Sequence, residues 1–210
     1  MSIIKSLEKR YATKKFDANK LVSNEAILQL KNAFNLTATS YGLQPLKLVI
    51  IQNKAIQQDL LEATMNQQQI TQASHVLVFC IDTKVDKDYI IAYFDRIKTV
   101  RNTPDDVLKG FRDYLINDFE NKTQEDIELW ATKQAYLAMG NLLTVCASLN
   151  IDACPMEGFS PKAYDSTFKL QDKNLKSVLV MPIGFRAEDD MFADMQKVRK
   201  SLTDVIIEIN

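Results

Sequence analysis

Apolar positions near the start of the chain follow the spacing of helices. Ser2 is placed to cap a short helix with an apolar face that ends near Arg10. Ser23 is placed to cap a second helix over 24–37, in which apolar residues recur every three or four positions. The cationic segment 10–16 therefore leaves the end of the first helix.

Further along, the pattern changes to short apolar runs of strand length. The runs 46–51, 75–81 and 177–183 are rich in β-branched residues, and 75–81 lacks polar alternation and should be covered on both faces. A polar helix over roughly 53–64 is expected between the first two runs. These runs predict a small central sheet, while a last apolar run at 205–209 has no neighbour in sequence to pair with.

The middle of the chain is expected to be helical. Charged and aromatic residues alternate in the stretch of about 85–125. This pattern predicts two peripheral helices that lie outside the core. A capping box at Thr123–Asp126 begins a helix that runs to about Leu149. Its second half, 135–147, is apolar on nearly all sides and must be buried, which a helix shared between two subunits would explain.

Composition limits the class of protein. The 210 residues, 46% of them hydrophobic, are expected to form a single globular domain over 1–210. The 26 basic and 27 acidic residues are intermixed, so we expect no nucleic-acid partner and no membrane partner, and no apolar run is long enough to span a bilayer. Three cysteines in apolar contexts, Cys80, Cys146 and Cys154, predict reduced, buried thiols and a cytoplasmic protein.

The side chains themselves offer little reactivity. The one histidine, His75, begins a buried strand, so no histidine triad and no pair of zinc ligands can form, and the cysteines lack C-x-x-C spacing. The carboxylate pairs Asp105–Asp106 and Asp189–Asp190 lie in polar stretches that we expect to be solvated. We therefore expect no catalytic side chain and no metal, and a bound cofactor would supply the chemistry of any enzyme here.

Two groups of basic residues predict an anion site. Arg10, Lys14 and Lys15 lie in segment 10–16, and Lys197 and Arg199 lie near the end of the chain. Because the five glycines are too scattered to form a phosphate-binding loop, these side chains would have to hold a phosphate. The alternative is that the first group only complements the dipole at a helix C-terminus.

A turn over 155–159 follows the long helix. Gly158 permits close backbone approach to a ligand, and the amides of Glu157 and Gly158 could donate hydrogen bonds to a flat ring. The alternative is that this segment is a turn with no ligand.

In this order and at these separations, the segments resemble the nitroreductase family of FMN-dependent NAD(P)H oxidoreductases, in particular the oxygen-insensitive bacterial enzymes and the related dihydropteridine reductases. The resemblance covers nearly the whole chain. It rests on runs at 10–17, 40–45, 73–76, 130–134, 140–141 and 155–159. It implies an α+β fold with a small, mainly antiparallel central sheet surrounded by helices, in an intertwined homodimer.

The resemblance also assigns residues to FMN. It implies that Arg10, Lys197 and Arg199 neutralise the phosphate, and that Lys14 lies against the pyrimidine edge near N1 and O2. The amides of Glu157 and Gly158 would face N5. The other expected cofactor contacts are Tyr11, Ala12, Asn66, Gln69, Pro155 and Met156, with Ala38, Thr39, Ser40 and Gly42 from the other subunit. The candidate substrate contacts are Tyr41, Arg101, Phe111 and Tyr114.

This chain departs from the family pattern at three positions. Ala12 stands where relatives commonly have serine, which removes one hydroxyl contact to the cofactor. Gln69 stands where close relatives often carry a second pyrimidine-side lysine, and this leaves the preference for NADH or NADPH open. Leu46 replaces a familiar tryptophan.

We therefore expect a homodimeric oxidoreductase that alternates between NADH or NADPH and an electron-poor acceptor at one open site. The acceptors would be nitroaromatics, quinones or pteridines. One alternative is a flavin-binding or sensing protein of the same fold without efficient turnover, suggested by Gln69. Another is a helical scaffold without a cofactor, in which the basic residues are solvated.

Overall fold

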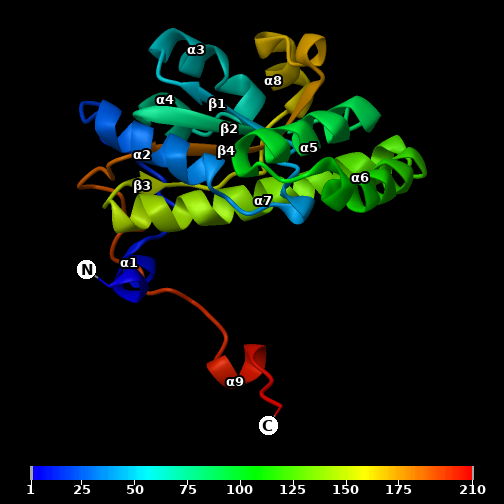
Figure 1. Ribbon diagram of the computed structural model, residues 1–210. Helices are drawn as coiled ribbons and strands as arrows, with labels where there is room; N and C mark the ends of the chain where they lie inside the picture. Colours follow the sequence, from blue (N-terminus) through cyan, green and yellow to red (C-terminus); the bar gives the residue numbers. More distant parts are fainter. Residues whose placement is uncertain (1, 210) are drawn as a thin grey trace.

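The computed structural model describes residues 2–209, and its centre is a four-stranded antiparallel sheet in the order β1-β2-β4-β3 (Figure 1). The strands are β1 (Leu46–Ile51), β2 (His75–Asp82), β3 (Asp152–Ala153) and β4 (Leu175–Gly184). The three apolar runs of the sequence thus become β1, β2 and β4. The α+β class and the antiparallel sheet are confirmed.

Helices surround the sheet, as expected (Figure 1). They are α1 (Ile3–Lys9), α2 (Asn24–Asn35), α3 (Lys54–Asp59), α4 (Gln69–Gln72), α5 (Lys87–Arg101), α6 (Asp105–Glu120), α7 (Gln124–Ser148), α8 (Pro161–Phe168) and α9 (Leu202–Val205). The predicted caps are present: the hydroxyls of Ser2 and Ser23 accept from the backbone of α1 and α2, and Thr123 forms a capping box with Asp126.

The helix expected over roughly 53–64 is confirmed only in its first half. α3 ends at Asp59 and is followed by a short 3₁₀ turn, Glu62–Thr64. Met65 and Asn66 then take left-handed backbone conformations, with φ of 55° and 56°, and this ends the helical course. The chain turns back towards α4 instead.

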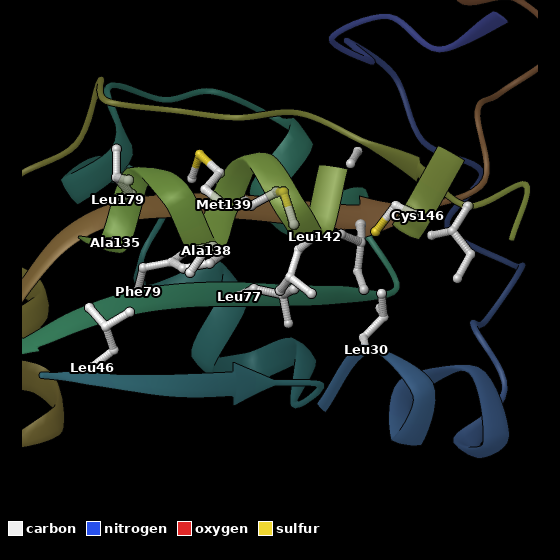
Figure 2. Packing of buried hydrophobic residues seen from close by; sticks show 14 of the residues in the cluster. Leu30, Leu46, Leu77, Phe79, Ala135, Ala138, Met139, Leu142, Cys146 and Leu179 are labelled. Carbon is white, nitrogen blue, oxygen red and sulfur yellow. The ribbon is translucent and has the colours of Figure 1, made fainter. Parts of the chain in front are cut away.

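Burial of β2 on both faces organises the core. Leu77 and Phe79 point towards α7 and α2 on one face, whereas Val76 and Val78 belong to the cluster with α3, α4 and α8 on the other. Figure 2 shows Leu77 and Phe79 packed beneath α7. All four side chains are at most 1% exposed, as the unbroken apolar run predicted.

The long helix α7 has a buried side and an exposed apolar side. Ala135, Ala138 and Leu142 face the sheet and are fully buried (Figure 2). On the exposed side, Tyr136 and Leu137 are about half exposed, at 47% and 56%. Within one chain the helix is thus only partly covered.

Both ends of the chain also expose apolar side chains. Ile3 and Ile4 of α1 are more than half exposed. The segment after β4 first follows the body and then extends away from it with α9 (Figure 1). Ile207 and Ile209, in the apolar run of the tail, are more than 90% exposed.

The three cysteines are buried and form no disulfide among residues 2–209, as expected. Over the same residues, none of the helices combines the length and the hydrophobicity that a membrane crossing requires.

Two leucines of α2 test this assignment of the core. Leu30 is 1% exposed, whereas Leu28, on the same helix, is 56% exposed. Leu30→Ala is expected to lower the free energy of unfolding by about 2–5 kcal/mol, because it opens a cavity. The matched control, Leu28→Ala, should change the free energy of unfolding by less than about 1 kcal/mol. Denaturant titration measures both, and equal losses would contradict the assignment.

Candidate functional site

The cationic segment 10–16 passes along β3 at the end of α1. Arg10 is the C-cap of α1, and Ala12 forms a parallel bridge to Ala153. The amide of Thr13 donates to the Ala153 carbonyl at 3.3 Å. Lys14 is thereby placed with its Nζ 4.0 Å from the Sγ of Cys154, at the start of the 155–159 turn. The two segments that the sequence proposed for one site are adjacent.

The C-terminal basic residues reach the same place. Burial and repulsion from Arg199 lower the pKa of Arg10. Burial also lowers the pKa of Lys197, and repulsion from Arg10, Arg199 and Arg186 adds to this effect. Three cations from the two ends of the chain therefore share one electrostatic environment.

Among residues 2–209, Arg10, Lys197 and Arg199 have no carboxylate within salt-bridge distance. Lys197 Nζ donates to the Glu8 carbonyl in the last turn of α1 at 2.5 Å, and Arg199 donates to its neighbour Val198. Lys197, from the C-terminal group of cations, thus bonds a terminal carbonyl of α1. Within the described part of the chain, the accumulated positive charge remains without a counterion.

The 155–159 turn presents two free amides. The amide of Met156 donates to the Val180 carbonyl and that of Phe159 to the Glu157 carbonyl. Between them, the amides of Glu157 and Gly158 have no acceptor among the described residues. Backbone donors without a partner at a site that is open to a ligand are available to bind that ligand.

The 62–69 turn packs against this segment. Gln67 Nε2 donates to the Gly158 carbonyl at 2.9 Å, and a Cβ on Gly158 would come within 3.1 Å of the same nitrogen. A side chain at position 158 would thus crowd Gln67, a residue that the sequence did not indicate. Asn66 is exposed in this turn, and Gln69 is 7% exposed at the start of α4. The two residues flank Gln67 in sequence, and their contact with a cofactor stays a prediction.

A different group of predicted residues gathers at α6 and α7. The amide of Ser40 donates to Gln134 Oε1 at 2.9 Å, which holds segment 38–42 against α7. The ring of Tyr41 stacks on Trp130 at 6.4 Å and meets Phe111 edge-on at 6.3 Å, and Phe111 stacks on Tyr114 at 6.3 Å. Arg101, in contrast, is exposed at the end of α5.

Segment 38–42 contains a tight turn. Gly42 has a φ of +74°, and a Cβ there would lie 2.5 Å from the Tyr93 hydroxyl. Ala38 is exposed, and Thr39 Oγ1 accepts from the Gln44 amide. Across residues 2–209, no hydrogen bond joins this segment to 10–14 or to 155–158. This separation is consistent with the expectation that the segment serves a site in another subunit.

The expectation that both members of Asp189–Asp190 are solvated is wrong for Asp190. Asp190 is 4% exposed, because the chain after β4 folds back over segment 10–16. Its carboxylate accepts a hydrogen bond from the Tyr11 hydroxyl at 2.8 Å. The Tyr11 ring in turn carries the guanidinium of Arg186, whose Cζ lies 4.5 Å from the ring centroid. The Tyr11 side chain thus ties segment 10–16 to the chain that follows β4.

A hollow of about 420 Å³ opens between α7 and the 155–159 turn. It is lined by Tyr136, Met139, Gly140, Leu143, Pro155, Met156, Glu157 and Leu179. At the edge of the hollow, the Tyr136 hydroxyl donates a hydrogen bond to Glu157 Oε1 at 2.7 Å. Within residues 2–209, no group of three His, Cys, Asp or Glu side chains is placed to hold a metal ion. The lining of the hollow is mainly apolar, and Glu157 is its one charged residue.

Comparison with known proteins agrees with this arrangement. The model of the nitroreductase family matches residues 7–185. The major NAD(P)H-flavin oxidoreductase of Aliivibrio fischeri is 31% identical, over 97% of each chain. The oxygen-insensitive NAD(P)H nitroreductase of Enterobacter cloacae is 29% identical, over 99% of this chain and all of that one. The chain belongs to the nitroreductase family.

The fold agrees as well. The FMN complex of a nitroreductase-fold protein from Exiguobacterium sibiricum superposes with a TM-score of 0.87, over 100% of this chain and 98% of that chain, at 18% identity. A nitroreductase family protein from Streptococcus pneumoniae superposes with a TM-score of 0.82 over the whole of both chains.

Proposed function

We propose that the protein is an FMN-dependent oxidoreductase that takes electrons from NADH or NADPH. The observation that carries this proposal is the meeting of three unpaired cations with two free backbone amides. Among residues 2–209, Arg10, Lys197 and Arg199 stand without a counterion, and the amides of Glu157 and Gly158 stand without an acceptor. The names of the two curated relatives support the same class of activity.

The residues present fit a phosphorylated flavin. A phosphate is a ligand of suitable charge for the cation group, and its binding would relieve the repulsion that lowers the pKa of Arg10 and Lys197. A flat ring with hydrogen-bond acceptors suits the amides of Glu157 and Gly158. Bound FMN would take a hydride from the nicotinamide at N5 and return it to an acceptor.

The side chains of this chain would bind and orient the reactants. Lys14 has no salt-bridge partner in the described part of the chain, and in the proposed pose its ammonium would stabilise negative charge at the pyrimidine edge. We propose that Asn66 and Gln69, which flank the Gln67 contact with Gly158 in sequence, contact the same ring. Burial raises the pKa of the Cys154 thiol, and Lys14 and Arg10 only partly oppose this effect, so we assign no role as a nucleophile to Cys154.

A second copy would complete each site. Segment 38–42 is hydrogen-bonded to Gln134 of α7, and α7 also exposes Leu137 and Tyr136, of which Tyr136 lines the hollow. Covering these side chains and the apolar ends of the chain with a partner would remove a large exposed apolar area. Ala38, Thr39, Ser40 and Gly42 would then reach the flavin of the other subunit.

The aromatic group at α6 suits planar acceptors. Tyr41, Phe111 and Tyr114 form a chain of ring contacts, and aromatic faces bind flat, electron-poor molecules by stacking. We propose nitroaromatics, quinones or pteridines, reduced by alternating use of one site. Arg101 stays a weaker candidate because it lies at the far end of α5.

Removal of one phosphate cation tests the cofactor site. Arg199→Ala is expected to weaken FMN binding by about tenfold to a hundredfold, because a charge-assisted contact is lost. Binding of riboflavin, which has no phosphate, should stay the same. Lys200→Ala is the matched control, since Lys200 is the exposed neighbour. Fluorescence titration measures all three proteins, and a wild type that binds neither flavin would contradict the proposal.

Rapid mixing tests the reaction. Anaerobic wild-type holoprotein mixed with NADH or NADPH should lose its flavin absorbance at about 450 nm, and an added quinone should restore it. Steady-state rates at several quinone concentrations should give parallel double-reciprocal lines, as expected for alternating use of one site. A protein that binds FMN but is bleached by neither nicotinamide would instead be the flavin-binding protein that Gln69 suggested.

Analytical ultracentrifugation tests the second copy. The wild type should sediment as a dimer, whereas Leu137→Arg should shift it towards monomer and weaken FMN binding, because a charge is placed in the proposed apolar contact. Val107→Arg is the control, since Val107 is an exposed apolar residue on α6. A monomeric wild type that binds FMN tightly would exclude the shared site.

A further inference from the structure

Asp190 joins the two cationic segments, and its contacts go beyond those of a surface carboxylate. Its Oδ2 accepts three hydrogen bonds, from the Tyr11 hydroxyl at 2.8 Å, the Lys14 amide at 2.9 Å and the Lys15 amide at 3.1 Å. Its Oδ1 accepts from the Phe192 amide at 3.1 Å. A carboxylate that satisfies several backbone donors fixes the shape of the loop that carries them.

Asp190 also lies at the start of the segment that carries the C-terminal cations. Segment 185–187 pairs with segment 15–17, since the Asp17 amide donates to the Phe185 carbonyl and the Ala187 amide donates to the Lys15 carbonyl. Asp190 continues this contact and is the last buried residue before the exposed segment that carries Lys197 and Arg199. One side chain thus holds the loop of Lys14 and also the origin of the segment that delivers the phosphate cations.

The environment keeps Asp190 ionised. Burial alone would raise the pKa of its carboxyl, but the hydrogen bonds from Tyr11, Lys14, Phe192 and Lys15 outweigh burial and hold the pKa below its ordinary value. The neighbouring Asp189 is in a different environment. It is exposed, and its carboxylate forms an ion pair with the ammonium of Lys15.

Resting on the proposed FMN site, we infer that Asp190 is a positioning residue for the flavin, which sets the place of Lys14 at the ring and of the phosphate cations together. It touches neither the ring nor the phosphate. It acts through the backbone of Lys14 and through the course of the segment towards Lys197.

Asp190→Asn should change the affinity for flavin in opposite directions under the two explanations, positioning and charge alone. Removing a negative charge beside a group of cations would, by electrostatics alone, strengthen the binding of an anionic flavin. Positioning predicts the opposite. The side-chain amide that this substitution introduces would offer one acceptor oxygen and two unwanted donors to four donor groups, so the loop would shift.

The experiment compares Asp190→Asn with Asp189→Asn, which removes the same charge one position away. Asp190→Asn is expected to weaken the binding of FMN and of riboflavin by about tenfold or more each. The reason is that both Lys14 and the phosphate cations would move. Asp189→Asn should bind both flavins as the wild type does. The midpoint potential of the flavin bound to the Asp190→Asn variant should fall by about 30 mV if the reduced form loses tenfold of its preference.

Thermal unfolding of the apoprotein serves as the structural check. If Asp190→Asn does not fold, Tyr11→Phe replaces it, since this variant keeps the ring beside Arg186 and removes one bond to Oδ2. This variant should weaken the binding of both flavins by about threefold to tenfold, and the apoprotein should keep most of its stability. Unchanged or tighter flavin binding in a folded variant would overturn the inference, whereas a wild type without flavin binding would overturn the proposed function itself.

Discussion

Burial of β2 on both faces is the constraint on which the other arrangements depend. Because β2 has no polar face, helices must cover the sheet from both sides, with α7 and α2 on one side and α3, α4 and α8 on the other. The antiparallel neighbour β4 then delivers the chain past β3 to segment 10–16. Segment 10–16 and the chain after β4 meet at this edge, where the short strand β3 is the last in the order β1-β2-β4-β3.

The candidate site arises where this packing leaves charge and backbone donors without partners. Arg10, Lys197 and Arg199 repel one another, and folding brings them together without a carboxylate from the described residues, which costs stability in the absence of an anion. The amides of Glu157 and Gly158 add two backbone donors that no acceptor in the described residues occupies. A ligand that neutralises the cations and accepts from these amides would stabilise the folded protein.

The sequence was sufficient for features that depend on local pattern and insufficient for those that depend on tertiary contact. Runs without polar alternation predicted β2 and β4, and the Thr123 capping box predicted the start of α7. The end of α3 at Asp59 was missed because no glycine or proline marks the change to the 3₁₀ turn Glu62–Thr64. Asp190 was predicted to be solvated because its polar stretch gives no sign of the donors that bury it. Three of these donors lie in segment 10–16, far away in sequence, and the fourth lies in the irregular chain after β4. The proposed role of segment 38–42 in a second subunit depends on contacts between two chains, and it comes from the family resemblance and not from a local pattern.

The departures of this chain from its family concentrate the electrostatic role on one residue. Ala12 keeps the course of the loop through its backbone bridge to Ala153, so only a hydroxyl contact is lost there. Gln69 is 7% exposed, and an ammonium at such a position would need an anion or a flavin oxygen to offset its desolvation. With a neutral amide at position 69, the remaining cation that the resemblance places at the ring is Lys14. In the proposed FMN complex, the stability of the reduced flavin would therefore depend on the loop geometry that Asp190 maintains.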